Sequence, residues 1–128
     1  MVAVKVFCPV NPSEDPDKVR AAVESIFPDA ELELVDGGFS GVASLDRFSK
    51  VIRGQRILDA VRGVMLANVR GNTTRMSLNK QVATVGKVSF VDRRPVLGAI
   101  EVTVRDDDIE ALIDRVAPMT VDGEEVRR

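Results

Sequence analysis

The sequence contains no histidine and only one cysteine, Cys8, and both shortages restrict the chemistry available to the chain. Without histidine there is no ordinary general base near neutral pH, so Ser-His and Cys-His nucleophile pairs are excluded. Zinc sites of the Cys/His type are excluded as well, and a single cysteine cannot form an intramolecular disulfide. We therefore expect a protein that is not an enzyme and that uses no metal or cofactor.

A long apolar run is also missing, which rules out a membrane-spanning helix. The first residues lack the apolar core and cleavage site of a secretory signal, so we expect a cytoplasmic protein. The chain has 128 residues, of which 45% are hydrophobic and 30% charged, the composition of an ordinary globular protein. This length predicts one domain, placed at residues 1–118, followed by a polar C-terminal tail at 119–128.

The charged residues are segregated along the chain, although the formal net charge is only −2. Between Ser44 and Val96 eleven basic residues stand against three acidic ones, and the flanks together are strongly acidic. A cationic stretch of this kind is a candidate footprint for an anionic polymer. The alternative is that the stretch pairs with the acidic flanks of its own chain, and the charges alone leave both interpretations open.

Apolar periodicity predicts a strand, a helix and a second strand in the first third of the chain. Residues 2–9 and 30–35 alternate between apolar and polar side chains, as strands do. Between them, Asp15 suits the N-cap and Pro16 the first position of an amphipathic helix, which Pro28 ends. The stretch that follows, 36–41, is rich in glycine and is predicted to form turns.

The remaining pattern predicts two helices, three strands and a final helix. The helices are expected at 45–54, 55–69 and from about 106 to 117, and the strands at 73–78, 87–91 and 97–104, with a hairpin connection at 92–95. The order β-α-β-α-α-β-β-β-α is typical of an α+β fold. We expect a mixed or antiparallel sheet with helices packed on one face.

Three features that resemble catalytic or ligand sites are better explained structurally. The acids at 106–108 could hold magnesium in a phosphoryl-handling enzyme, but acids in a first helical turn usually cap the helix. The stretch 86–89 lacks the earlier glycine of a phosphate loop, because Gln81 occupies that position. Cys8 lies beside Val6 on an apolar strand face, which indicates a buried structural thiol.

Nucleic-acid binding agrees better with the pattern of polar residues after the strand at 73–78. Arg75 and Asn79 share a face of this strand, and Lys80 and Gln81 follow at its end. A cation, an amide and a backbone turn at one strand end can hold phosphates and contact exposed base edges. The alternative is that Asn79 and Gln81 satisfy backbone groups within the turn.

The aromatic residues limit the mode of binding, because tryptophan and tyrosine are absent and only five phenylalanines occur. Phe27, Phe48 and Phe90 fall in apolar stripes and are expected in the core. Only Phe7 and Phe39 remain as candidate stacking platforms. Binding through base stacking is therefore poorly supported, and contacts with the phosphates and the shape of a structured RNA are favoured.

A set of short stretches in this chain occurs together in one known family. They are Pro9-Val10-Asn11-Pro12-Ser13-Glu14, Ile26-Phe27-Pro28-Asp29-Ala30, Gln55-Arg56-Ile57-Leu58-Asp59-Ala60, Leu78-Asn79-Lys80-Gln81 with Ala83 and Gly86, Leu97-Gly98 with Ile100, and Ile113-Asp114 with Ala117-Pro118 and Thr120. Through them the chain resembles, over nearly its full length, an archaeal family described as predicted exosome-associated or RNA-binding. Ser13 and Val82 depart from the pattern, where threonine and alanine are expected, and neither changes the charge.

The resemblance implies a fold like that of a ribosomal protein from the central protuberance of the large subunit, an α+β domain that contacts RNA. It implies no established activity. The residues that match the polar positions of the family, and to which the resemblance extends RNA binding, are Gln55, Arg56, Asn79, Lys80 and Gln81. The residues that rest on the charge distribution alone are Arg47, Arg53, Arg70 and Arg75.

These observations predict a cytoplasmic, non-catalytic RNA-binding protein that uses a basic surface from the central segment. Its expected partner is a structured RNA, with a role in RNA processing or in a ribosome-related assembly, and no membrane. The alternative is a protein-interaction module, either a homodimer or an adaptor, that binds no nucleic acid. The candidate RNA-binding residues are Arg47, Arg53, Gln55, Arg56, Arg70, Arg75, Asn79, Lys80 and Gln81.

Overall fold

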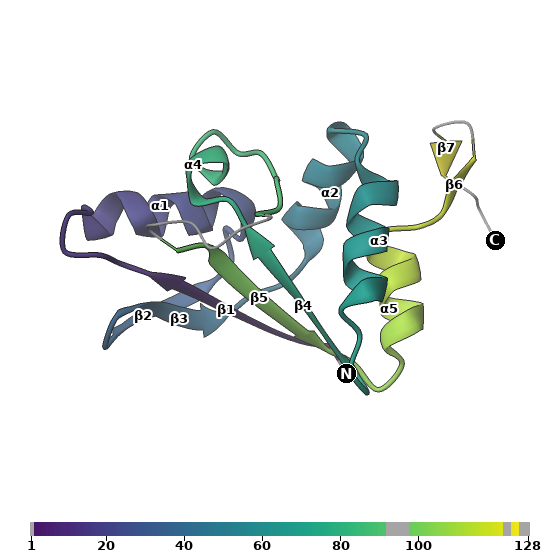
Figure 1. The fold of residues 1–128 in the computed structure, drawn as a ribbon, viewed down its shortest axis with the longest axis horizontal. Coiled ribbons are helices and arrows are strands. Elements are labelled where there is room, and N and C mark those ends of the chain that lie inside the picture. The colour runs from purple at the N-terminus through teal and green to yellow at the C-terminus, as the bar shows by residue number, and fades with distance from the viewer. Residues whose placement is uncertain (1, 92–97, 122–123, 126–128) are drawn as a thin grey trace.

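Five strands form one antiparallel sheet in the structure, a computed structural model that describes residues 2–91, 98–121 and 124–125. The strands lie side by side in the order β2-β3-β1-β5-β4 (Figure 1). They are β1 (Ala3–Pro9), β2 (Glu31–Val35), β3 (Gly38–Val42), β4 (Thr73–Leu78) and β5 (Ile100–Arg105). Strand β1 is therefore central, and β2 and β4 are the two edges.

The helices of the described residues lie on one side of this sheet (Figure 1). They are α1 (Pro16–Ile26), α2 (Asp46–Gly54), α3 (Leu58–Ala67), α4 (Lys80–Ala83) and α5 (Ile109–Val116). Helices α1 and α4 cover one end of the sheet, and α2, α3 and α5 lie toward the other end (Figure 1). The predicted α+β class, with an antiparallel sheet and helices on one face, is confirmed.

Alternation along the strands gives the sheet two different faces. On β1, Val4, Val6 and Cys8 are buried beneath the helices, whereas Lys5 and Phe7 are exposed on the opposite side. Strands β4 and β5 show the same alternation of buried and accessible residues. We call the side turned away from the helices the outer face of the sheet.

The core joins the end of α1 to α2 through two aromatic rings. Phe27 and Phe48 are both fully buried, and their rings stack with centroids 6.1 Å apart. The start of α1 follows the sequence pattern, because the Asp15 carboxylate accepts a hydrogen bond from the Asp17 backbone N–H at 3.0 Å. Helix α1 is thus fixed at its start by a cap and at its end by core packing.

The prediction of turns throughout residues 36–41 is wrong, because this segment contains most of β3. Only residues 36–37 form the turn, and Gly37 there has a φ of 89°, in the left-handed region that favours glycine. A Cβ at Gly41 would lie 2.1 Å from the Glu31 carbonyl oxygen, so β2 and β3 approach closely at this point. The glycines permit a tight strand pair and at the same time obscure its alternation.

The strand expected at 87–91 is also absent from the sheet as described. Its only ladder contact is an isolated bridge between Leu78 and Phe90. The neighbouring hairpin expected at 92–95 lies outside the described residues. The element order therefore differs from the predicted one. Strand β3 is added directly after β2, and the short helix α4, rather than a strand at 87–91, lies between β4 and β5.

Part of the polar tail expected at 119–128 is structured. Strands β6 (Thr120–Val121) and β7 (Glu124–Glu125) form a separate two-stranded sheet. The Thr120 hydroxyl donates to Asp59 of α3 at 2.6 Å, and Glu125 forms an ion pair with Arg53 of α2 at 3.0 Å. A domain boundary at residue 118 stays a prediction.

Replacing Phe48 by alanine tests whether the stacked pair holds α1 against α2. Removing a fully buried ring leaves a cavity, so we expect F48A to lower the free energy of unfolding by about 3–5 kcal/mol. Val85 is 70% exposed, and V85A as the control should change stability by less than about 0.5 kcal/mol. Urea denaturation measures both, and a loss below about 1 kcal/mol for F48A contradicts the described packing.

Candidate nucleic-acid interface

The nine candidate residues do not form one surface. Arg75 lies on the outer face of the sheet, whereas α4, which contains Lys80 and Gln81, lies on the helix side. Arg47 and Arg53 belong to α2, at another position on the helix side. Their side chains also differ in how much they are already engaged within the protein.

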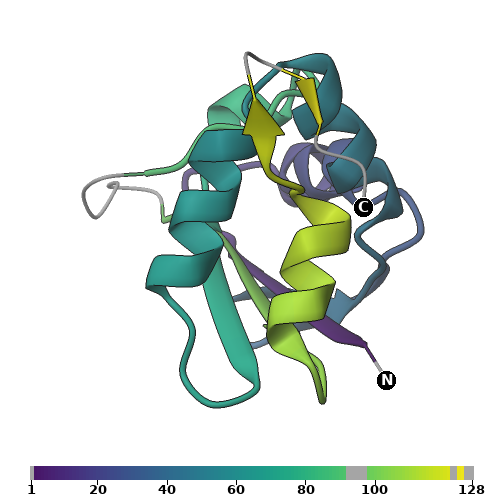
Figure 2. The same cartoon turned by 90° about the vertical axis from the view of Figure 1, so that its right-hand side faces the viewer.

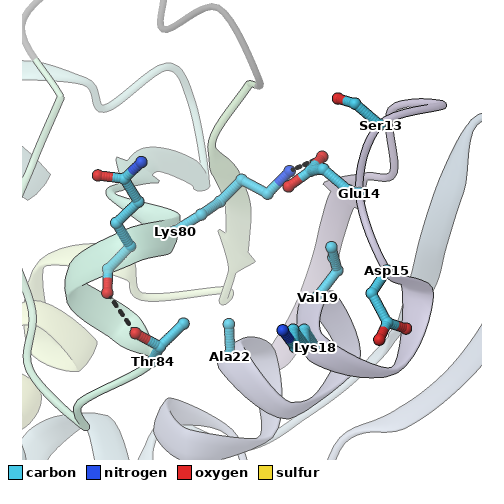
Figure 3. A pocket seen from close by; sticks show the side chains of 9 residues that line it. Ser13, Glu14, Asp15, Lys18, Val19, Ala22, Lys80 and Thr84 are labelled. Atoms are coloured by element: carbon cyan, nitrogen blue, oxygen red, sulfur yellow. Dashed lines mark hydrogen bonds and ion pairs between the residues drawn. The ribbon is translucent and has the colours of Figure 1, made fainter.

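Lys80 is buried and paired. Its side chain is 8% exposed, and the ammonium group lies 2.9 Å from the Glu14 carboxylate and donates to the Pro9 carbonyl at 2.7 Å. Figure 3 shows the Lys80 side chain directed at Glu14, beside a hollow of about 340 Å³ between α1 and α4. This lysine connects α4 to the turn that precedes α1, so its ammonium is not displayed to a ligand.

The Glu14 carboxylate is held in its charged form by these contacts. Burial alone would raise the pKa of Glu14, but hydrogen bonds from Lys80 and from the Asn11 side chain and backbone outweigh it, so the pKa lies below its ordinary value. Because the carboxylate is stabilised only in the folded protein, this cluster contributes to stability.

Gln55 and Asn79 both satisfy backbone groups. The Gln55 amide donates to the Val88 carbonyl at 2.9 Å and accepts from the Val88 N–H at 2.6 Å, in the manner of a strand partner. The Asn79 side chain caps α4 by accepting from the Val82 N–H at 3.0 Å. The Asn79 side chain thus satisfies a backbone group in the turn, as the alternative to RNA binding predicts. Gln81 is exposed.

The α2–α3 corner combines basic and acidic side chains. Arg53 donates to the carbonyl oxygens of Ser49 and Arg115, in addition to its ion pair with Glu125. Arg56 is exposed and has a φ of 59°, an uncommon value for a residue with a side chain. Arg47 is exposed on α2. Of the three, Arg53 is the most occupied by contacts within the chain.

A different set of cations gathers at one end of the outer face. Lys5 of β1 and Arg75 of β4 both pair with Thr103 of β5, so the three form a row across the strands. Arg105 lies two residues along β5 from this row, on the same face. Arg70 is joined to the start of β4 by a bridge to Thr73. Figure 2 looks onto the side of the molecule where α3 and α5 lie, with the turn that leads from α3 into β4 at the bottom.

We call Lys5, Arg70, Arg75 and Arg105 the outer-face cations. All four are exposed, and within the described residues none of them forms an ion pair. Arg70 and Arg75 also line a shallow hollow together with Asn68 and Thr73. An exposed cationic cluster without internal counter-ions is an electrostatic site for an anion.

The only phenylalanine that the described residues expose substantially lies next to this cluster. Phe7 is 37% exposed and lies two residues from Lys5 on the same strand. Phe39, the other platform expected from the sequence, is 5% exposed and belongs to the core. One of the two candidate platforms is therefore accessible, in the centre of the sheet.

The far half of the outer face has the opposite charge. Glu31 and Glu33 of β2 end the two rows that contain Lys5 and Phe7. On β5, Glu101 lies opposite Phe7 and Ser77 and accepts a hydrogen bond from the Ser77 hydroxyl at 2.7 Å. An anionic ligand on this face is therefore directed away from β2 and from Glu101, toward the end of β4 and β5 at which Arg75 and Arg105 lie.

Sequence reasoning missed Lys5 and Arg105, because both lie in the acidic flanks rather than in the basic central segment. The strand alternation does place each on the polar side of an apolar strand, and this was visible in the sequence. What the sequence did not provide is the order β1-β5-β4, which brings positions about 100 residues apart into one row.

The acids at 106–108 serve the structure. Asp108 caps α5 by accepting from the Ala111 N–H at 3.1 Å, and Asp106 accepts from the Asp108 N–H and pairs with Arg115 at 3.4 Å. The capping interpretation is confirmed. In the part of the chain that the structure describes, no group of three metal-ligating side chains comes together. Burial raises the pKa of the Cys8 thiol to about 11, so this thiol is not a nucleophile near neutral pH.

Comparison with known proteins connects this fold to a family. A family model described as RNA binding matches residues 2–105. A UPF0201 protein of Sulfurisphaera tokodaii is 38% identical, over 96% of this chain and 92% of that protein. The chain belongs to the UPF0201 family. A protein of Archaeoglobus fulgidus named UPF0200/UPF0201 protein is 40% identical over 98% of this chain, which spans 40% of that relative's length.

Solved structures agree with this assignment. The crystal structure of a UPF0201 protein from Methanococcus jannaschii matches with a TM-score of 0.91 and 34% identity, over 98% of this chain and 99% of that one. A second crystal structure, of an Archaeoglobus fulgidus protein of the family DUF54, matches with a TM-score of 0.64 at 19% identity and shows the fold alone. None of the described helices has the length and apolar character needed to cross a membrane.

The role of Lys80 can be tested through stability. K80M leaves Glu14 without its cation in a largely buried site, so we expect the free energy of unfolding to fall by about 3 kcal/mol at pH 7. The pKa of Glu14 is lowered by folding, so the contribution of the pair is complete above the ordinary glutamate pKa of about 4.3 and is lost as the pH falls through the lowered value.

Urea denaturation between acidic and neutral pH measures this difference, with K87M, at an exposed lysine, as the matched control. The difference in the free energy of unfolding between wild type and K80M should disappear on acidification, whereas K87M should be as stable as wild type at every pH. A K80M protein as stable as wild type at pH 7 contradicts a structural role for the pair.

Proposed function

We propose that this protein binds RNA through the outer-face cations, with Phe7 beside them as a platform for one unpaired base. The observation that carries the proposal is the row formed by Lys5, Thr103 and Arg75 across three neighbouring strands, extended by Arg105. The match of residues 2–105 to a family described as RNA binding supports the same ligand. The family description and the names of the relatives also favour a protein that is not an enzyme.

The geometry favours contacts with the phosphate backbone. Neighbouring strands lie about 4.8 Å apart, so Lys5 and Arg75, separated by β5, are about 10 Å apart across the sheet. Arginine binds phosphate through two parallel N–H groups, and three of the four outer-face cations are arginines. Such contacts fix the position of an RNA strand without reading its sequence.

Phe7 adds a contact that only an unpaired base can make. Its ring lies on the central strand, next to the cationic row. Stacking of one base on an exposed aromatic ring is worth about 1–3 kcal/mol. The preferred ligand is therefore a loop or single-stranded segment within a structured RNA, bound mainly through its phosphates.

Arg47, Arg56 and Gln81 are exposed on other parts of the surface and remain proposed contacts for a longer RNA. Arg53, Gln55, Asn79 and Lys80 are proposed to act indirectly, because each is engaged in contacts that hold the α2–α3 corner or the segment around α4. A role in RNA processing or in a ribosome-related assembly agrees with this proposal and stays a prediction.

The salt dependence of RNA binding tests the proposed surface. We expect the triple variant K5Q/R75Q/R105Q to bind a labelled RNA hairpin with an unpaired loop more weakly, and the slope of log Kd against log salt to fall by about 2, since each phosphate contact with a single strand contributes about 0.7. Fluorescence anisotropy at several salt concentrations measures the slope.

The matched control is K18Q/K50Q/K87Q, which removes the same charge from exposed lysines outside the outer face. The general attraction between protein and RNA falls equally in both variants, because both lose three positive charges. The control should nevertheless lose much less affinity, because it keeps the proposed contacts of Lys5, Arg75 and Arg105. Equal losses in the two triple variants would show that only net charge matters and would remove the case for this surface.

Replacing Phe7 by alanine is expected to lower the affinity for RNA without changing the slope of log Kd against log salt. F7A should weaken binding to the looped hairpin by about fivefold to a hundredfold through the lost stacking. Binding to a fully paired hairpin of the same length should not change. An F7A variant that binds both RNAs as wild type does contradicts the stacking contact.

A further inference from the structure

The edge strand β4 is closed by the chain itself. Because hydrogen-bonded pairs alternate in an antiparallel ladder, the backbone groups of Arg75 and Ser77 point away from β5. The Arg75 carbonyl accepts from the Asn68 side-chain amide at 3.1 Å, and the Ser77 carbonyl accepts from the Val91 N–H at 3.2 Å. A further strand would have to displace these contacts, so the β4 edge is protected.

The opposite edge, β2, is open. The two-residue turn at 36–37 makes Val35 and Gly38 a hydrogen-bonded pair, and the alternation then directs the backbone N–H and C=O of Leu32 and Leu34 away from the sheet. Within the residues that the structure describes, no group hydrogen-bonds to these outward positions. The edge therefore offers two donors and two acceptors at the spacing of a strand.

The side chains of β2 alternate between apolar and acidic. Leu34 is 63% exposed although it lies on the helix-covered side of the sheet, and Val35 is 39% exposed. Glu31 and Glu33 are exposed on the outer face and form no ion pair with any described residue. The strand has no proline or lysine, which are common means of protecting an edge from pairing.

We infer that the β2 edge binds an extended segment of a partner protein in which basic side chains alternate with apolar ones. The added strand would pair its backbone with Leu32 and Leu34. Its lysine or arginine side chains would face Glu31 and Glu33 on the outer face, and its apolar side chains would cover Leu34 on the other. Charge complementarity selects this partner among strands of equal length.

A second copy of this chain fits the edge poorly. The antiparallel register that pairs all five residues of β2 with a second β2 places Glu33 opposite the partner's Glu33. Like charges directly opposite each other in a ladder are destabilising. The same glutamates that attract a basic strand therefore discourage pairing of the protein with itself.

Titration of the full chain with synthetic peptides tests the inference. The probe is a capped peptide with the core Lys-Val-Lys-Val-Lys, and the controls are Glu-Val-Glu-Val-Glu and the non-alternating Lys-Lys-Lys-Val-Val. In amide NMR spectra we expect the alternating basic peptide to shift the resonances of 31–35 and to slow exchange of the Leu32 and Leu34 amides with solvent. It should bind about tenfold more tightly than either control.

Three variants separate binding at the β2 edge from general attraction of a basic peptide to an acidic protein. L34P removes an outward N–H at a position where edge strands accept proline, so it should abolish binding while L34V retains it. The variant E31K/E33K should reverse the preference and bind the Glu-Val-Glu-Val-Glu peptide more tightly, a gain that an unfolded protein cannot show.

Four outcomes would overturn the inference. The first is equal binding of the alternating and non-alternating basic peptides, and the second is binding whose shifts lie away from β2. The third is a dimer of the free wild-type chain, detected by light scattering, that L34P dissociates, because the edge would then bind a second copy. Unchanged peptide specificity in E31K/E33K would show that the glutamates do not select the partner.

Discussion

The structure depends on the fact that helices cover only one face of its sheet. Val4, Val6 and Cys8 and their counterparts on β4 and β5 supply the apolar side on which the helices pack. The same alternation leaves Lys5, Phe7 and Arg75 on the outer face, where no described element covers them. Burial of one face is therefore both the source of stability and the reason that a row of cations is presented to solvent.

Much of the fold could be predicted from the sequence, because long periodic segments carry strong patterns. The Asp15 cap, Pro16 at the helix start and the apolar stripe that follows gave α1 nearly to the residue. Strand β3 could not be predicted in the same way. Gly41 is required by the close approach of β2 and Gly38 by the close approach of β1, whereas the composition of this stretch is that of a turn.

The candidate site was harder to predict, because position along the chain does not determine burial. Lys80 belongs to the most cationic stretch of the sequence, yet its ammonium is sequestered by Glu14 and the Pro9 carbonyl. Lys5 and Arg105 belong to acidic flanks, yet they stand beside Arg75 on the outer face. Counting charges along the chain found the segregation, but only strand order and register show which charges share a surface.

Mapping the contact surface of a bound RNA tests the central claim most directly. In amide NMR spectra recorded at low salt with a looped RNA hairpin, the account predicts that the largest shifts fall on Lys5, Phe7, Arg75 and Arg105, while the resonances of α1 and α4 hardly change. Largest shifts on the helices, with the outer face unaffected, would contradict it. So would the absence of any shift at RNA concentrations that saturate an unspecific basic protein.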